Sequence, residues 1–80
     1  MPTSAYKHIA AIVKYHRKNA GLTQNQLATL AGVGKTVVFD IEHDKETIQL
    51  QSLIKVFEVL NIRIELSSPL ISQYGEDTHA

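Results

Sequence analysis

One short segment, residues 31–36, contains residue types that can bind phosphate, in the order Ala31-Gly32-Val33-Gly34-Lys35-Thr36. Glycine, lysine and threonine in this order also end the phosphate-binding loop of nucleotide-binding proteins. That loop needs a further glycine five residues before Gly34, where this chain has Thr29, and it needs a preceding strand, whereas helical periodicity precedes it here. The sequence therefore argues against a nucleotide site.

The other groups that could carry out chemistry lack the spacing that a site requires. The four histidines are not spaced as an i, i+4 pair and the chain has no cysteine, so a zinc site has little support. No serine, histidine and carboxylate grouping has a recognisable catalytic context, and 80 residues leave little room for a substrate pocket. We expect no enzyme activity, no metal and no cofactor.

Length and composition indicate one small domain in a reducing compartment. Eighty residues with 44% hydrophobic content can form a single core. The absence of cysteine fits the cytoplasm, where disulfides are rare. No apolar run approaches the roughly 18 residues that a membrane span needs, so we expect a cytoplasmic protein without a membrane partner.

The net charge is zero, but the charges are unevenly distributed along the chain. Residues 1–39 carry five cations and no acid, namely Lys7, Lys14, Arg17, Lys18 and Lys35. Residues 40–80 carry three cations and eight acids, and 3 minus 8 gives −5. This polarity suggests separate surfaces for two different partners, with the early cations on the helices that approach a polyanion.

Periodicity and capping residues predict three helices in the first half of the chain. The first covers residues 5–20 and ends at Gly21. The second begins at Gln24, because Thr23 and Gln26 have the spacing of a capping box, and it ends at Gly32. The third covers residues 35–42 with Gly34 as its N-cap. Two short helices joined by a glycine-containing turn form a helix-turn-helix.

A fourth helix and one strand are expected in the second half. Apolar residues from Leu50 to Leu60 predict the helix, which Asn61 closes. In residues 62–66 the period changes from 3.6 to 2, which predicts a strand. Because no other segment of the chain has strand character, a second copy of the same strand is the simplest partner. Residues 1–70 thus form the domain, and we expect residues 71–80 to be a disordered tail.

These motifs resemble the phage-repressor and Xre-type family of DNA-binding proteins. The resemblance rests on Gly21-Leu22-Thr23-Gln24-x-x-Leu27-Ala28-x-x-Ala31-Gly32-Val33 and on Val38-x-Asp40-Ile41-Glu42. Residues 47–66 extend it to the HipB-like antitoxin branch, through Thr47-Ile48-Gln49-Leu50, Leu53-Ile54-Lys55-Val56 and Leu60-Asn61-Ile62-Arg63-Ile64-Glu65-Leu66. The resemblance covers roughly residues 6–70. It implies an all-α fold of four to five helices, with one short C-terminal strand that pairs across a homodimer.

The resemblance also implies which residues contact DNA. In this family the third helix enters the major groove, so the base-reading residues would be Gly34, Lys35, Thr36, Phe39 and Asp40. The residues that would contact phosphate are Thr23, Gln24 and Val37. Gly34, Val37 and Phe39 depart from the residues that the family commonly has at these positions, which weakens any inference about the operator sequence.

In the HipB-like branch, the resemblance implies autorepression of an operon and binding to a HipA-type kinase toxin. The expected dimer residues are Phe57, Leu60, Ile62, Arg63, Ile64, Glu65 and Leu66. If two strands pair antiparallel about Ile64, Arg63 lies opposite Glu65 of the other chain, and the three apolar residues share the other face. Such a dimer would bind a palindromic double-stranded operator.

A second class of function stays open. The helix-turn-helix could act as a protein-binding adaptor, with Leu30, Val37 and Phe39 as an exposed apolar contact patch. Steep salt dependence would favour DNA binding, since an apolar protein contact does not release counterions.

Overall fold

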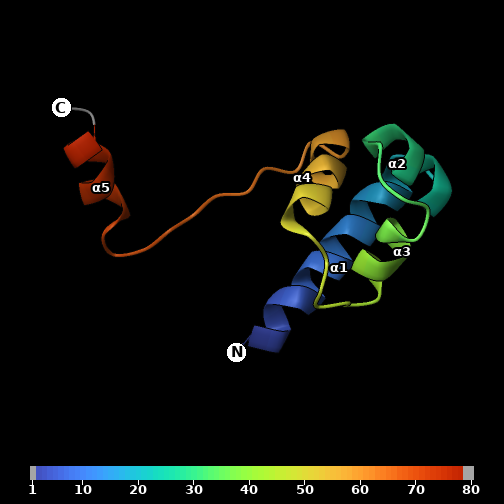
Figure 1. Ribbon diagram of the computed structural model, residues 1–80, viewed down its shortest axis with the longest axis horizontal. Helices are drawn as coiled ribbons and strands as arrows, with labels where there is room; N and C mark the ends of the chain where they lie inside the picture. The colour runs from blue at the N-terminus through green and yellow to red at the C-terminus, as the bar shows by residue number, and fades with distance from the viewer. Residues whose placement is uncertain (1, 79–80) are drawn as a thin grey trace.

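Helices account for all the regular structure in the computed structural model, which describes the backbone of residues 2–78 and the side chains of residues 8–75. In chain order the helices are α1 (Pro2–Asn19), α2 (Gln24–Ala31), α3 (Val37–Glu42), α4 (Leu50–Val59) and α5 (Ile71–Thr78). The first four form a bundle, and α5 lies apart from it at the end of an irregular segment (Figure 1). The all-helical class and the first four helices are therefore confirmed. No helix of the described residues has the length and apolar character needed to cross a lipid bilayer.

The turns around α2 follow from the capping residues. The backbone N–H of Gln26 donates to the Thr23 hydroxyl at 3.0 Å, and the Thr23 N–H donates to the Gln26 side-chain oxygen at 2.8 Å. At the other end, Gly32 adopts the left-handed conformation with φ of 70°, which an L side chain rarely tolerates. Both features confirm the predicted bounds of α2.

The start of α3 differs from the prediction. The N-cap is Thr36 rather than Gly34, and the helix begins at Val37. The Val37 N–H donates to the Gly34 carbonyl at 3.1 Å, which closes a tight turn over Lys35 and Thr36 before the first helical bond forms between Asp40 N–H and Thr36 O at 2.8 Å. Lys35 therefore lies in a turn that precedes the helix.

The core is formed where α1 to α4 meet. Val13, Leu27, Val38 and Val56 contribute one fully buried side chain from each of these helices. Phe57 and Leu60, which we expected at a dimer interface, are 7% and 8% exposed and belong to this core. The apolar face of α4 is broad enough to pack against α2 and α3 within the chain, which accounts for the difference.

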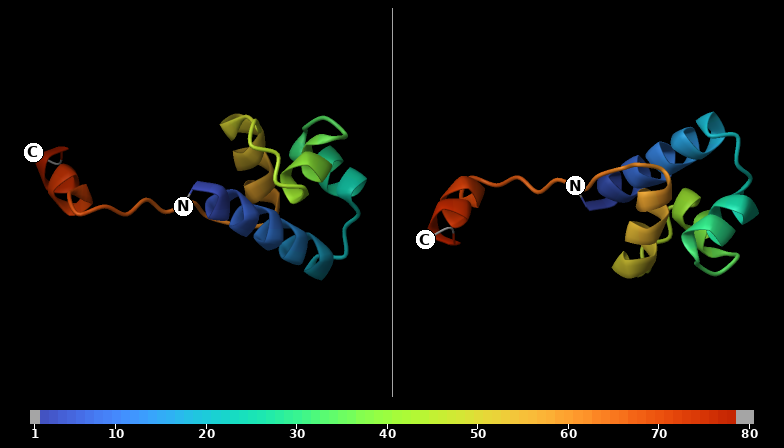
Figure 2. Two further views of the ribbon diagram at one scale, coloured as in Figure 1. Left: turned by 90° about the horizontal axis from the view of Figure 1, so that it is seen from below. Right: turned by 90° about the horizontal axis from the view of Figure 1, so that it is seen from above.

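Residues 62–66 form no strand in the described part of the chain. A strand is defined by hydrogen bonds to a neighbouring strand, and the described residues of a single chain provide none. The segment leads away from the bundle to α5 (Figures 1 and 2).

Helix α5 lies where we expected a disordered tail. Its first turn is closed by hydrogen bonds from the Ile71 N–H to Ser68 O at 3.2 Å and from the Tyr74 N–H to Leu70 O at 3.0 Å. Leu70 and Tyr74 are four residues apart and so lie on one helical face, a pattern too short to stand out in the sequence. Residues 79 and 80 of the expected tail lie outside the described residues.

Candidate nucleic-acid interface

The predicted base-reading residues lie at the entrance to α3. Gly34, Lys35 and Thr36 are exposed in the turn that precedes the helix, and Phe39 is 48% exposed one helical turn later. Residues three apart on a helix share a face, so Thr36 and Phe39 lie on the same side of α3. This places a cation, a hydroxyl and an apolar ring together on one solvent-facing surface.

The Phe39 ring is held by a second aromatic residue that was not among the predicted site residues. The ring of His43 stacks on it with a centroid separation of 3.8 Å and an interplanar angle of 19°. The Nδ1 atom of His43 also lies 2.7 Å from the Phe39 carbonyl oxygen. The i, i+4 spacing of the two residues is the signal in the sequence that could have revealed this contact. Phe39 therefore presents an apolar ring whose position is fixed from one side.

Asp40 faces the loop that follows α3. Its carboxylate lies 3.5 Å from Lys45 Nζ, and its carbonyl oxygen accepts a hydrogen bond of 3.1 Å from the Lys45 N–H. The Asp40 side chain is 25% exposed, less than that of Lys45 at 53%. The carboxylate is thus partly occupied within the chain, which makes Asp40 a weaker base-reading candidate than Lys35 or Thr36.

The N-terminus of α2 contributes the residues expected to contact phosphate. The Thr23 hydroxyl accepts the capping bond from Gln26 but keeps its own O–H as a donor. Gln24 is the first residue of the helix, so its backbone N–H has no partner inside α2. Unpaired N–H groups at a helix N-terminus favour an anion, which fits a phosphate at this position.

The Gln24 side chain is fixed by a carboxylate at the end of α3. Its Nε2 atom donates to Glu42 Oε1 at 3.0 Å. Because a primary amide has two N–H groups, one of them remains for a second acceptor. Gln24 therefore joins α2 to α3 and still has a donor for a phosphate oxygen.

Glu42 also pairs with Arg17 from α1, and the two side chains form a buried ion pair. Arg17 Nε donates to Glu42 Oε2 at 2.7 Å and Arg17 Nη2 donates to Glu42 Oε1 at 3.1 Å, while Nη1 donates to the Leu22 carbonyl at 2.8 Å. The Arg17 side chain is 11% exposed and the Glu42 side chain is 2% exposed. The pair links α1, the turn before α2 and the end of α3, and so fixes the two helices of the helix-turn-helix relative to α1.

The pKa of Glu42 is lowered and the pKa of Arg17 is raised, and both shifts favour the charged form of the group. For Glu42, burial raises the pKa, but hydrogen bonds from Arg17 and Gln24 and the positive charges of Arg17 and Lys14 outweigh burial, so the pKa lies below its usual value. For Arg17, the hydrogen bond to Glu42 raises the pKa, burial opposes the rise, and the Glu42 charge adds to it. Both groups are charged at neutral pH.

Arg17 corrects one expectation from the sequence. We expected it among the cations that approach a polyanion, but it is 9% exposed and its charge is balanced by Glu42. Its spacing in the sequence could have indicated this burial, because Arg17 follows Val13 by four positions and so lies on the buried face of α1. The neighbouring cations Lys14 and Lys18 are exposed.

Val37 was predicted both to contact phosphate and to belong to the exposed apolar patch. Its side chain is half-buried and packs against the core, which reduces the apolar patch, while the phosphate contact stays a prediction. As the first residue of a helix that covers the core, it points its side chain partly inward. Leu30 and Phe39 remain exposed, at 61% and 48%.

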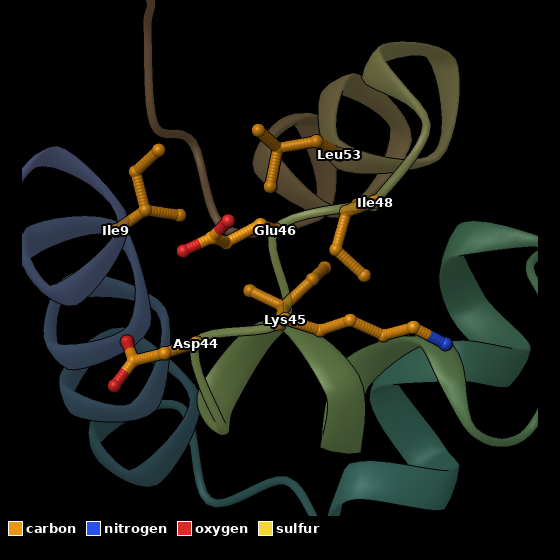
Figure 3. A pocket seen from close by; sticks show the side chains of 7 residues that line it. Ile9, Asp44, Lys45, Glu46, Ile48 and Leu53 are labelled. Atoms are coloured by element: carbon orange, nitrogen blue, oxygen red, sulfur yellow. The ribbon is translucent and has the colours of Figure 1, made fainter. Parts of the chain in front are cut away.

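A small cavity lies between α1, the loop after α3 and α4 (Figure 3). Its volume is about 70 Å³, and Ile9, Ile48 and Leu53 line it beside Asp44 and Glu46. The Lys45 side chain extends away from the two carboxylates in Figure 3. Pockets for small-molecule ligands hold roughly 300–1,000 Å³, so this cavity is too small for one.

The chain is similar to known proteins over most of its length. A family model described as helix-turn-helix matches residues 13–66. The matched region includes the end of α1, all of α2, α3 and α4, and the segment that follows them. The chain is also 36% identical over 61 residues to the uncharacterized HTH-type transcriptional regulator y4mF of Sinorhizobium fredii, a match that covers 76% of this chain and 80% of that protein.

Proposed function

Because the chain belongs to the helix-turn-helix family and is a DNA-binding transcriptional regulator, we propose that it is a repressor that binds a specific operator as a homodimer. The observation that carries the proposal is the exposed group formed by Lys35, Thr36 and Phe39 at the entrance to α3. In the family docking mode, the first turn of the recognition helix meets base edges in the major groove. These three side chains are the ones available there.

Each of the three can contact a base edge in the major groove. Lys35 can donate to O6 and N7 of guanine, and Thr36 can form a hydrogen bond or touch a thymine methyl. Phe39 can contact a thymine methyl with the ring that His43 supports. Gly34 lets the backbone approach the DNA, and Asp40 contributes less because Lys45 pairs with it. Thr23 and Gln24 set the register by binding phosphate.

The proposed dimer forms through the segment that follows α4. Residues 62–66 have alternating apolar and charged side chains and no strand partner within the described chain. Pairing with a second copy about Ile64 satisfies their backbone groups and places Arg63 opposite Glu65 twice. Two recognition helices then bind half-sites about 34 Å apart, or a multiple of that distance.

Within this function, we propose the finer role of an antitoxin of the HipB-like branch. Such a protein represses its own operon and neutralises a HipA-type kinase toxin. The sequence resemblance over residues 47–66 supports this role, and so do the acids that follow the helix-turn-helix in the sequence, which are available to a partner other than DNA.

The structure gives the adaptor hypothesis less support than the DNA-binding function. It requires an apolar contact patch, and two of its three residues, Leu30 and Phe39, are exposed, whereas Val37 packs against the core. A patch of two side chains is small for a specific interface. We therefore favour the DNA-binding function.

Footprinting on the DNA upstream of the protein's own gene tests the proposed function. We expect protection of two half-sites related by a two-fold axis, at protein concentrations at which unrelated DNA stays unprotected. Equal protection of unrelated DNA, or none at all, would contradict an operator-specific repressor.

Native purification from the source cell tests the antitoxin role separately. We expect a kinase of the HipA type to co-purify at a defined ratio, and the purified chain to abolish its phosphorylation activity. A chain that binds its operator but neither retains nor inhibits such a kinase would be a repressor without the antitoxin role.

A further inference from the structure

Two apolar surfaces of this chain are exposed to solvent at once. The first is the face at the start of α5, where Leu70, Ile71 and Tyr74 are 67%, 42% and 66% exposed. The second is a groove between α1 and α4, which we name the α1/α4 groove. It is lined by Ile9, Ile12, Leu50, Leu53, Phe57 and residues 62–65. Exposed apolar surfaces of this kind mark interaction sites.

The whole chain exposes more surface than a compact monomer of its size. Its accessible surface is 6182 Å², whereas a compact monomer of this mass exposes roughly 4,800 Å². Its radius of gyration is 14.8 Å, against roughly 11.6 Å for a compact domain of this length. The excess surface of roughly 1,400 Å² exceeds the about 800 Å² that each partner buries in a standard interface. Helix α5 and the irregular segment before it lie outside the bundle and so contribute to this excess (Figure 2).

We propose that α5 of one copy packs into the α1/α4 groove of the other copy in the homodimer. This inference rests on the dimer of the proposed function and adds a second contact to it. The apolar side chains at the start of α5 would cover Ile12 and Leu50, which are 41% and 65% exposed. Both surfaces occur once in each chain, so a two-fold axis satisfies both copies at once.

The course of the chain favours packing on the second copy rather than on the same copy. In each chain, residues 62–65 line one edge of the groove and then lead away from the bundle (Figures 1 and 2). Antiparallel pairing about Ile64 places Leu66 of the second copy opposite Ile62 of the first. The chain of the second copy then continues past the end of α4 and over the groove of the first copy.

The charges of the two segments differ in sign along the sequence. Residues 66–80 contain two acids and no lysine or arginine, whereas α1 contains four cations and no acid. Inside the α1/α4 groove, Arg63 and Glu65 balance each other, and Arg17 of α1 is already paired with Glu42. The difference between the segments therefore adds a long-range attraction, while the apolar side chains make the contact in the groove.

Crosslinking between two different variants tests the contact directly, because the natural chain has no cysteine. Ile12→Cys and Ile71→Cys are prepared separately, mixed to allow subunit exchange, and treated with a bismaleimide. We expect a covalent dimer that contains one chain of each variant. The double variant, Ile12→Cys with Ile71→Cys, tests the alternative that α5 folds back onto the groove of its own chain. A crosslink only within single chains would overturn the proposal in favour of that alternative. The absence of any crosslink would also overturn the proposal.

A matched pair of substitutions measures the contribution of the contact to dimerisation. Leu70→Asp replaces an apolar side chain at the start of α5, and Leu30→Asp replaces one of similar exposure, 61%, on α2. By sedimentation equilibrium, we expect Leu70→Asp to raise the dimer dissociation constant at least tenfold and Leu30→Asp to leave it unchanged. Equal effects of the two variants would overturn the proposal.

Operator binding by the wild-type chain separates this inference from the proposed function. If the wild-type dimer binds its operator but Ile12→Cys and Ile71→Cys form no mixed crosslink, the α5 contact is wrong and the repressor function stands. If the mixed crosslink forms and no DNA is bound specifically, the contact stands and the proposed function is wrong.

Discussion

Side chains at the start of α2 and just before α3 have different roles in the proposed DNA contact. Lys35 and Thr36 are exposed in the turn before α3, where no hydrogen bond or ion pair of the described residues restrains their side chains. Gln24, by contrast, is held by Glu42 at 3.0 Å, which fixes its orientation before DNA arrives. A restrained donor suits a contact that sets register, and unrestrained donors can adapt to base edges.

Substitution of Lys35 by alanine separates base reading from phosphate binding. If Lys35 contacts a guanine, Lys35→Ala costs about 1–3 kcal/mol of binding free energy and relaxes the preference at one base pair. If it contacts only phosphate, affinity falls equally for all sequences. Footprinting titrations on an operator series measure this, with Lys55→Ala on α4 as a control for loss of charge. An unchanged affinity would remove Lys35 from the interface.

Substitution of Gln24 by alanine tests the phosphate contact. We expect Gln24→Ala to weaken operator binding by about 1 kcal/mol, the net contribution of a typical hydrogen bond, without altering base preference. Because glutamine is uncharged, the salt dependence of binding should stay the same. Fluorescence anisotropy titrations measure both quantities, with Gln51→Ala on α4 as the control. A change in base preference would contradict the assignment.

At the scale of the elements, the buried Arg17 and Glu42 pair joins α1 to α3. Its polar atoms all have partners, since no buried side-chain nitrogen or oxygen of the described residues lacks a hydrogen bond. Removing one partner of such a pair leaves an uncompensated buried charge. The pair therefore supports a single arrangement of the recognition helix on the bundle, and the orientation of Gln24 depends on it.

The lowered pKa of Glu42 predicts a dependence of stability on pH. The folded-state pKa lies below the ordinary value of 4.5, so the stabilisation is fully present above about pH 4.5 and is lost as the pH falls through the folded-state pKa. In urea unfolding measured from neutral pH to about pH 3, wild type should exceed Glu42→Gln in free energy of unfolding, and the difference should narrow in acid. A difference that is constant with pH would show that the Glu42 charge does not stabilise the fold.

The sequence predicts the presence of the helices more securely than their exact boundaries or the side-chain pairs between them. Apolar spacing and caps such as Thr23 and Gly32 are local, so they locate the first four helices. The start of α3 depends on a turn bond between Val37 and Gly34, which favours a cap two residues later than the composition suggests. The pairing of Arg17 with Glu42 spans 25 residues, and only the position of Arg17 on the buried face of α1 indicates it.

At the scale of the whole molecule, the zero net charge conceals a separation of charges. The first half still carries exposed cations at Lys14, Lys18 and Lys35, although the burial of Arg17 reduces the number that can face DNA. The acids of the second half lie mainly after the helix-turn-helix. Long-range attraction to DNA should therefore be moderate, while the local contacts stay available.

Charge reversal at residue 65 tests the proposed dimer. In the antiparallel register, Glu65→Lys places a lysine opposite Arg63 of the other chain, twice in each dimer. Like charges directly opposite each other repel, so we expect weaker dimerisation. Sedimentation equilibrium measures the dissociation constant, and Glu58→Lys on the exposed surface of α4 serves as the control. An unchanged dissociation constant would contradict this register.

The salt dependence of binding to the upstream operator tests the central claim most directly. Lys35 is the cation that the proposal places against the DNA, and if it displaces one counterion in each protomer, the dimer displaces two. This predicts a fall in affinity of about tenfold when the salt concentration rises about fourfold. The operator should also compete at least a thousandfold better than random DNA. An affinity that does not change with salt, together with equal competition by random DNA, would contradict a sequence-specific DNA-binding repressor.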